Sequence, residues 1–182
     1  METKKSILDL IKSRRSCRKF KQDSVPDEDI MGVLEAAKWA PSGGNSQPWK
    51  FIIIKNKETM EKIVELIPYR EFQNFLRLAP VLIVVLGNSK KMWHIIDGSL
   101  ATQNLMLEAW ARGLGTCFSA WWPTAPEKVV IPVKEILKIP EKYVIITMTP
   151  LGYPIDPPEE AFHLPPSRKP LEKIISYETF SS

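Results

Sequence analysis

The stretch that decides the fold is Pro41–Trp49, with the sequence PSGGNSQPW. It follows a helical pattern and precedes an apolar, β-rich run, so it joins a helix to a strand. Its two glycines let backbone amides come close to a ligand, because no Cβ stands in the way. Ser42, Asn45 and Gln47 add side chains that both donate and accept hydrogen bonds, which suits a planar heterocycle. A plain polar loop closed by Pro48 is the alternative interpretation.

The composition is that of an ordinary folded protein. A chain of 182 residues fits a single domain, residues 1–182, that buries most of its apolar surface. No apolar run reaches the roughly 18 residues of a membrane span, and the polar start METKKSILDL lacks a signal-peptide core. The two cysteines cannot form a disulfide framework and favour a reducing compartment, so we expect a cytoplasmic protein. The two histidines lack metal-ligand spacing, so no metal site is expected.

Hydrophobic periodicity predicts helices and strands along the whole chain. Helices are expected over residues 5–13, 27–39, 57–66, 93–112, 126–137 and 171–175, and strands over residues 50–55, 80–87, 116–122 and 143–151. Residues 69–78 are ambiguous, although their aromatic and apolar content favours a helix. Because the spacing gives no regular βαβ units, the expected fold is a three-layer α+β domain rather than a doubly wound parallel sheet. The prolines between Pro154 and Pro170 predict an arm that can lie across a second subunit.

Several nucleotide-binding and hydrolase signatures are missing from the sequence. There is no GxxxxGK[ST] phosphate loop. Gly113-Leu114-Gly115 begins a GxG, but the third glycine of a dinucleotide fingerprint is absent and a strand follows where a helix should start. No GxSxG elbow occurs and Cys117 has no evident histidine partner, so nucleophilic hydrolysis has little support.

Two basic clusters stand near the two ends of the chain, which has a net charge of +4. The first is RRSCRKF, Arg14–Phe20, and the second is Ser167-Arg168-Lys169. Such clusters could hold a nucleic acid, an anionic membrane or a single phosphate, or simply remain solvated. Arginine forks bind phosphate oxygens in a bidentate manner. Nucleic-acid binders interleave more aromatic residues than the single Phe20 found here, so the pattern favours a phosphorylated heterocyclic cofactor.

Six motifs together resemble the nitroreductase-like flavoprotein family. They are RRSCRKF, VPDEDI, APSGGNSQPW, GLGTC, LGYP and SRKPLEKII. Each motif alone is weak, but the six occur in the order of the family and cover nearly the whole chain. The resemblance implies an α+β homodimer with a mostly antiparallel central sheet flanked by helices and a C-terminal arm that extends onto the partner. It also implies one FMN at each interface, held by residues of both subunits.

The resemblance carries cofactor-binding positions onto this chain. The contacts to the FMN phosphate and ribityl chain would be Arg14, Arg15, Ser16 and Arg18, with a second phosphate contact from Arg168. The loop that approaches the flavin, partly from the partner subunit, would be Ser42, Gly43, Asn45 and Gln47. The segment beside the isoalloxazine would be Phe118, Ser119 and Ala120, followed by a late turn at Gly152.

Other polar and aromatic residues are given structural roles. We interpret Asp97, Gln103 and Asn104 as polar groups that tie the long helix to neighbouring loops. Trp110 and Trp121-Trp122 are interpreted as core or interface residues, because large aromatic side chains contribute most when buried. No residue is expected to act as a catalytic acid or base, since the flavin itself carries redox chemistry.

The activity implied by the resemblance is a ping-pong oxidoreduction. NAD(P)H would give a hydride to FMN and leave before a nitroaromatic, quinone or similar small organic acceptor takes the electrons. One alternative is a branch of the family with different flavin chemistry, either reductive dehalogenation or flavin fragmentation. Another is a non-enzymatic flavin-binding or nucleic-acid-binding protein, although neither nucleic acid nor membrane is the expected partner.

Overall fold

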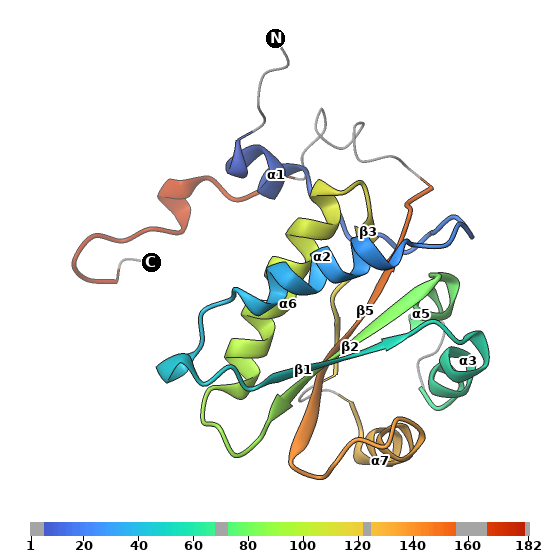
Figure 1. Ribbon diagram of the computed structural model, residues 1–182. Helices are drawn as coiled ribbons and strands as arrows, with labels where there is room; N and C mark the ends of the chain where they lie inside the picture. The colour runs from blue at the N-terminus through green and yellow to red at the C-terminus, as the bar shows by residue number, and fades with distance from the viewer. Residues whose placement is uncertain (1–5, 68–72, 122–124, 156–166, 181–182) are drawn as a thin grey trace.

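The computed structural model describes residues 6–67, 73–121, 125–155 and 167–180 (Figure 1). Its helical elements are α1 (Ile7–Ser13), α2 (Asp27–Lys38), η1 (Gly43–Asn45), α3 (Lys57–Glu65), α5 (Phe75–Leu78), α6 (His94–Ala111), α7 (Glu127–Ile136) and η2 (Leu171–Lys173). Its strands are β1 (Trp49–Ile54), β2 (Val81–Asn88), β3 (Gly115–Thr116), β4 (Ser119–Ala120) and β5 (Tyr143–Gly152). Within these described ranges no helix combines the length and the apolar character needed to cross a membrane.

The strands form one antiparallel sheet between two helical layers. The order is β1-β2-β5-β3, and β4 also pairs with β5. Successive side chains of a strand point to opposite faces, so central strand β2 serves both layers. Ile83 and Val85 pack with α2 and α6, whereas Leu82 and Val84 pack with α3, α5 and α7. All four side chains are 0% exposed, and the predicted three-layer α+β fold is confirmed.

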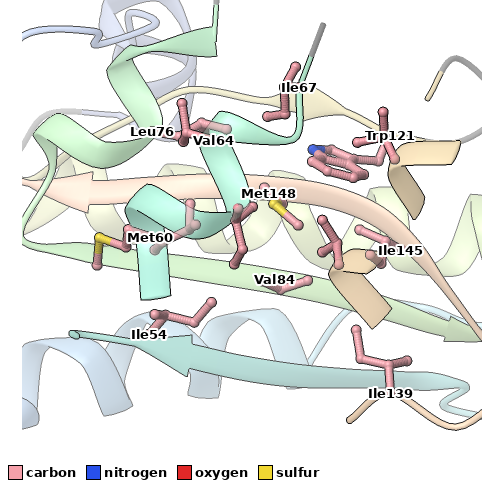
Figure 2. Packing of buried hydrophobic residues seen from close by; sticks show 14 of the residues in the cluster. Ile54, Met60, Val64, Ile67, Leu76, Val84, Trp121, Ile139, Ile145 and Met148 are labelled. Carbon is pink, nitrogen blue, oxygen red and sulfur yellow. The ribbon is translucent and has the colours of Figure 1, made fainter. Parts of the chain in front are cut away.

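Figure 2 shows the core on the face covered by α3, α5 and α7. Val64 of α3 lies beside Leu76 of α5 over the sheet, and Met60 of α3 and Met148 of β5 belong to the same cluster. The indole of Trp121 lies at the edge of this cluster and is 4% exposed, which confirms its predicted place in the core. This packing fixes the segment that leads into Trp121.

The strand predicted over residues 116–122 is divided in two. β3 and β4 keep one register against β5, with Thr116 opposite Leu151 and Ser119 opposite Met148. In this register Cys117 faces Pro150, and proline has no N–H to donate to a neighbouring strand. The ladder is therefore interrupted between β3 and β4. The sequence pattern could not show this break, because the proline lies on a distant strand; Trp122 lies outside the described residues.

The start of α2 agrees with the expected helix over residues 27–39. Aspartate is a residue type that often caps a helix, but here Pro26 is the N-cap and Asp27 is the first helical residue. The carboxylate of Asp27 instead forms an ion pair with Lys55, which follows β1. Asp27, Glu28 and Asp29 all lie in the first turn, where the helix dipole favours negative charge.

The C-terminal part of the chain is described only after residue 166. The helix expected over residues 171–175 is the short 3₁₀ turn η2. Most of the predicted proline-rich arm, residues 156–166, lies outside the described residues. The segment from Ser167 to Phe180 exposes Leu171, Ile174, Tyr177 and Phe180. The ambiguous stretch of residues 69–78 contains α5, while residues 69–72 are likewise not described.

Gly152, at the end of β5, is packed so closely that a methyl group does not fit. A Cβ at this position would lie 2.6 Å from Cδ of Pro80 and 3.2 Å from Cδ1 of Phe20. Because both neighbours are rigid rings, we expect Gly152→Ala to lower the free energy of unfolding by about 1–3 kcal/mol, as overpacking does. Urea denaturation measures this change. In a Pro80→Ala background the loss should shrink, and an equal loss in both backgrounds would contradict the steric explanation.

Candidate functional site

The candidate site begins where α1 meets the last turn of α6. Ser13, which is 1% exposed, donates from Oγ to the carbonyl of Leu10 at 3.0 Å. The same oxygen accepts a hydrogen bond from Nε1 of Trp110 at 2.9 Å. Trp110 is buried as predicted, with 4% of its surface exposed. These bonds tie α1 to α6, so the side chain of Arg14, the next residue, leaves from a fixed point.

Three guanidinium groups gather at this point, those of Arg14, Arg15 and Arg168. Burial lowers the pKa of Arg14 below its usual value, and repulsion from Arg15 and Arg168 acts in the same direction, although the thiols of Cys117 and Cys17 oppose it. Nη1 of Arg14 is buried and has no hydrogen-bond partner among the described residues. A buried charged donor without an acceptor is costly. The cluster therefore has the charge and the unused donor that a phosphate group would satisfy.

The other two arginines of the cluster are already engaged locally. Nη1 of Arg15 donates to the carbonyls of Lys12 at 2.8 Å and Ser13 at 2.6 Å, at the C-terminal end of α1. Nη1 of Arg168 donates to the carbonyl of Ser167 at 2.9 Å, and the residue is exposed. Arg15 thus completes the end of the helix, where a cation is favourable, while it adds positive charge to the cluster.

Beside the cluster lies a cleft of about 830 Å³. It opens between the segment after α1, the start of α5 and the break between β3 and β4. The residues that line it are Arg18, Lys19, Gln73, Asn74, Phe75, Leu78, Cys117, Phe118, Ser119 and Ala120. One chain thus brings together four predicted site residues, namely Arg18, Phe118, Ser119 and Ala120.

Hydrogen bonds and ring contacts fix the walls of the cleft. Oγ of Ser119 donates to Oε1 of Gln73 at 2.6 Å, and the carbonyl of Ser119 accepts from Oγ1 of Thr147 at 2.8 Å. The guanidinium of Arg18 lies 5.6 Å from the ring centre of Phe75, within the range of a cation–π contact. β4 and the segment before α5 therefore hold the polar groups of Ser119 and Gln73 at set positions in the cleft.

Cys117 lies at the junction of the cleft and the arginine cluster. Burial raises the pKa of its thiol, while the charges of Arg18 and Arg14 and a hydrogen bond with Ser16 act in the opposite direction. Because burial dominates, the group remains a neutral thiol near pH 7. Ser16 itself pairs with Thr116 through a parallel β-bridge, which holds the segment after α1 against β3.

The loop from Ser42 to Gln47 forms a separate part of the candidate site. The N–H of Gly43 donates to Oδ1 of Asp97 at 3.1 Å, and Oγ of Ser42 accepts from the N–H of Gln47 at 3.0 Å. Asn45 and Gln47 have φ values of 54° and 44°, a left-handed conformation that is uncommon outside glycine. Such backbone persists only where surrounding contacts hold it, which the two hydrogen bonds do.

Contacts from α6 and the turn before it hold this loop in place. A Cβ on Gly43 would lie 2.3 Å from Cδ1 of Trp93, so only glycine fits there. Nδ2 of Asn104 donates to the carbonyl of Ala36 at 3.2 Å. The predicted tie between the long helix and a loop is therefore confirmed for Asp97, whereas Asn104 ties α6 to helix α2. Gln103 is exposed and forms no such tie to the described residues.

The loop and the arginine cluster lie at opposite ends of α6 (Figure 1). Asp97 in the first turn holds the loop, and Trp110 in the last turn holds Ser13. At 1.5 Å per residue these two contacts are about 20 Å apart along the helix. None of the loop residues 42–47 lines the cleft. A single chain therefore does not bring the loop together with the other predicted site residues.

The structure also shows residues that the sequence did not single out. Gln73, Asn74 and Phe75 line the cleft, but they fall in the stretch whose secondary structure was ambiguous. In the sequence, the only sign of their role was that Gln73 and Asn74 are polar and stand directly before an apolar segment. Gly152, predicted to touch the cofactor, has a packing reason of its own against Pro80.

Comparisons with known proteins identify the family of this chain. The sequence model of the nitroreductase family matches residues 11–70 and 67–153. The chain belongs to the nitroreductase family. This confirms the resemblance carried by the six sequence motifs.

Three relatives show the range of the family around this chain. A protein of Methanothermobacter thermautotrophicus, provisionally named NADH dehydrogenase/NAD(P)H nitroreductase, is 36% identical over 176 residues, covering 94% of this chain and 89% of that protein. Iodotyrosine deiodinase of Thermotoga neapolitana is 28% identical, covering 97% of this chain and all of that protein. An FMN-dependent nitroreductase of Clostridium difficile R20291 superimposes with a TM-score of 0.83 at 26% identity, covering 95% and 99% of the two chains.

The hydrogen bond between Gly43 and Asp97 predicts how the loop responds to substitution. We expect Asp97→Ala to speed hydrogen exchange of the Gly43 amide about tenfold or more, because a hydrogen bond to a charged group contributes about 1.5–3 kcal/mol. Asp97→Asn keeps an oxygen acceptor and should preserve most of the protection. Gln103→Ala, on an exposed site of the same helix, is the control. Wild-type exchange in Asp97→Ala would show that the carboxylate does not hold the loop.

Proposed function

We propose that the protein is a cytoplasmic, homodimeric, FMN-dependent oxidoreductase. It would take a hydride from NAD(P)H and reduce a nitroaromatic, quinone or similar small organic acceptor by a ping-pong mechanism. The observation that carries this proposal is the half-buried Arg14, whose buried Nη1 has no partner among the described residues and which has two neighbouring guanidinium groups, beside a cleft of about 830 Å³. FMN would supply the redox chemistry when bound, and the residues of the chain bind and orient it.

The arginine cluster fits the phosphate end of FMN. A dianionic phosphate would offer acceptors to Nη1 of Arg14 and would offset the repulsion between Arg14, Arg15 and Arg168. Guanidinium forks bind such oxygens in a bidentate manner, and the exposed hydroxyl of Ser16 adds a neutral donor nearby. Because Ser13 is fixed to Trp110, Arg14 is positioned for this contact before the phosphate arrives.

The cleft fits the ring end of the same cofactor. The side chain of Phe118 is 40% exposed and offers an apolar surface. Ser119 and Gln73, joined by a hydrogen bond, place amide and hydroxyl groups where a heterocycle with both donors and acceptors would lie. Their role is to orient the rings and to exclude water, and no protein acid or base is required.

A second copy of the chain would supply the missing loop. The loop Ser42–Gln47 lies outside the cleft of its own chain, as the length of α6 requires. Large apolar side chains remain exposed on α1 and α6, including Ile7 at 77% and Ile96 at 54%. Tyr177 and Phe180 near the C-terminus are 85% and 90% exposed. Apolar surface of this extent is typical of an interface, so we infer a homodimer with two shared sites.

Reductive dehalogenation is the second candidate function. The iodotyrosine deiodinase of Thermotoga neapolitana matches this chain over its full length, so the size of this chain does not separate it from that activity. Turnover of an iodinated phenol, measured beside turnover of a nitroaromatic with the same electron donor, distinguishes the two functions.

The visible spectrum of the purified protein tests the cofactor and the electron donor. We expect a yellow protein with flavin absorption that bleaches when NADH or NADPH is added without oxygen. A colourless protein that also fails to take up added FMN would refute the proposal. If the protein is yellow but neither nucleotide bleaches it, it binds flavin and the assignment of NAD(P)H as electron donor is wrong.

Substitutions in the arginine cluster test the phosphate contacts. We expect Arg14→Ala and Arg168→Ala each to weaken FMN binding about tenfold or more, since each removes a charge-assisted hydrogen bond. Flavin fluorescence quenching gives the affinity, and size-exclusion chromatography should show an unchanged dimer. Lys90→Ala removes the same charge from an exposed turn and should leave the affinity as it is. Unchanged flavin affinity in both arginine variants would show that the cluster is not the phosphate site.

A further inference from the structure

Lys19 is a cation in the cleft that the cofactor contacts leave unused. It lines the cleft next to Arg18, yet it is not part of the arginine cluster proposed for the FMN phosphate. Its side chain is exposed and forms no ion pair or hydrogen bond with the described residues. The guanidinium of Arg18 is held over the ring of Phe75, so Lys19 is the cation free to meet an incoming molecule.

The backbone around Lys19 is held firmly against the end of β5. The carbonyl of Lys19 accepts a hydrogen bond from the N–H of Ile155 at 3.3 Å, and the N–H of Lys21 donates to the carbonyl of Tyr153 at 2.8 Å. Between them Phe20 is 5% exposed and forms a β-bridge with Pro154. Lys19, which lines the cleft, is therefore attached to a fixed backbone.

The charge of the cleft is positive. Arg18 and Lys19 are its cations, and the remaining lining residues that the structure describes are neutral, with no carboxylate among them. A concave surface lined by one sign of charge concentrates ligands of the opposite sign. The exposed ring of Phe118 adds an apolar surface to the same cleft. An anionic molecule with a planar ring matches both features.

We propose that Lys19 makes the second-substrate site selective for anions by binding a carboxylate or phosphate of the molecule that meets the cofactor. This inference rests on the proposed function, because it concerns the substrates of the same cleft. The anionic group can belong to the electron donor or to the electron acceptor. It is the 2′-phosphate of NADPH on the donor side, or the carboxylate of an aromatic acceptor on the other.

The test compares Lys19→Gln with Lys21→Gln in the full-length protein saturated with FMN. Lys21 is also exposed and lies two positions further along the chain, but it does not line the cleft. Its substitution by glutamine removes the same charge as that of Lys19. Acceptor selectivity is the ratio of kcat/KM for 4-nitrobenzoate to that for 4-nitrobenzyl alcohol. Donor selectivity is the ratio of kcat/KM for NADPH to that for NADH, measured with the neutral acceptor.

We expect Lys19→Gln to raise KM for the anionic member of a pair about fivefold, the upper end for an exposed ion pair. Neither kcat nor the kinetics of the neutral acceptor should change, and Lys21→Gln should behave as the wild type. A change confined to the donor pair identifies the 2′-phosphate as the bound group, and one confined to the acceptor pair identifies the carboxylate. Unchanged ratios in both pairs, or equal effects of the two substitutions, would overturn the proposal.

Flavin content separates this proposal from the one on which it rests. A wild-type protein that binds no FMN or is not reduced by NAD(P)H refutes the proposed function itself. If Lys19→Gln lowers FMN affinity while both selectivity ratios stay at wild-type values, Lys19 binds the cofactor and selectivity for anionic substrates is refuted.

Discussion

Helix α6 sets the geometry on which the candidate site depends, because its two ends hold the two halves of the site. The helix packs between the sheet and α2, with Ala101 and Leu105 fully buried. Its first turn binds the loop through Asp97, and its last turn binds α1 through Trp110. A packed helix does not shorten, so side-chain movement cannot close the separation of about 20 Å. In the proposed function, the second copy that brings the two halves together is required by the length of one secondary-structure element.

The arginine cluster shows how the fold prepares a site that is unfavourable without a ligand. Burying a guanidinium without an acceptor and near two like charges opposes folding. The bond between Ser13 and Trp110 nevertheless holds Arg14 in place. A ligand that binds only the folded state stabilises it by mass action. In the proposed function the anion that relieves the cluster is the cofactor phosphate, so cofactor binding and folding stability are coupled through Arg14.

The sequence predicted the elements and the order of the site motifs better than the contacts between them. β2 was predicted from its continuous apolar run. Such a run indicates a central strand, because both faces of a central strand are buried. The break between β3 and β4 depends instead on Pro150, a partner on another strand that periodicity cannot report. Asp27, a residue type that often caps helices, is instead the first residue of α2, because Pro26 is the N-cap.

The site residues also divide into those that the sequence predicted and those whose role depends on contacts between distant segments. RRSCRKF was predicted to bind an anion because charge is visible in the sequence, and the structure places Arg15 and Arg168 within electrostatic range of Arg14. Gln73 was missed because its role comes from a hydrogen bond to Ser119 rather than from a local pattern. The two cationic regions also differ in burial, which sequence cannot give. Arg14 is half-buried with a buried Nη1, so salt screens its charge less than that of the exposed Lys19. In a ping-pong cycle this division is useful, because the cofactor must stay while donor and acceptor exchange at one site.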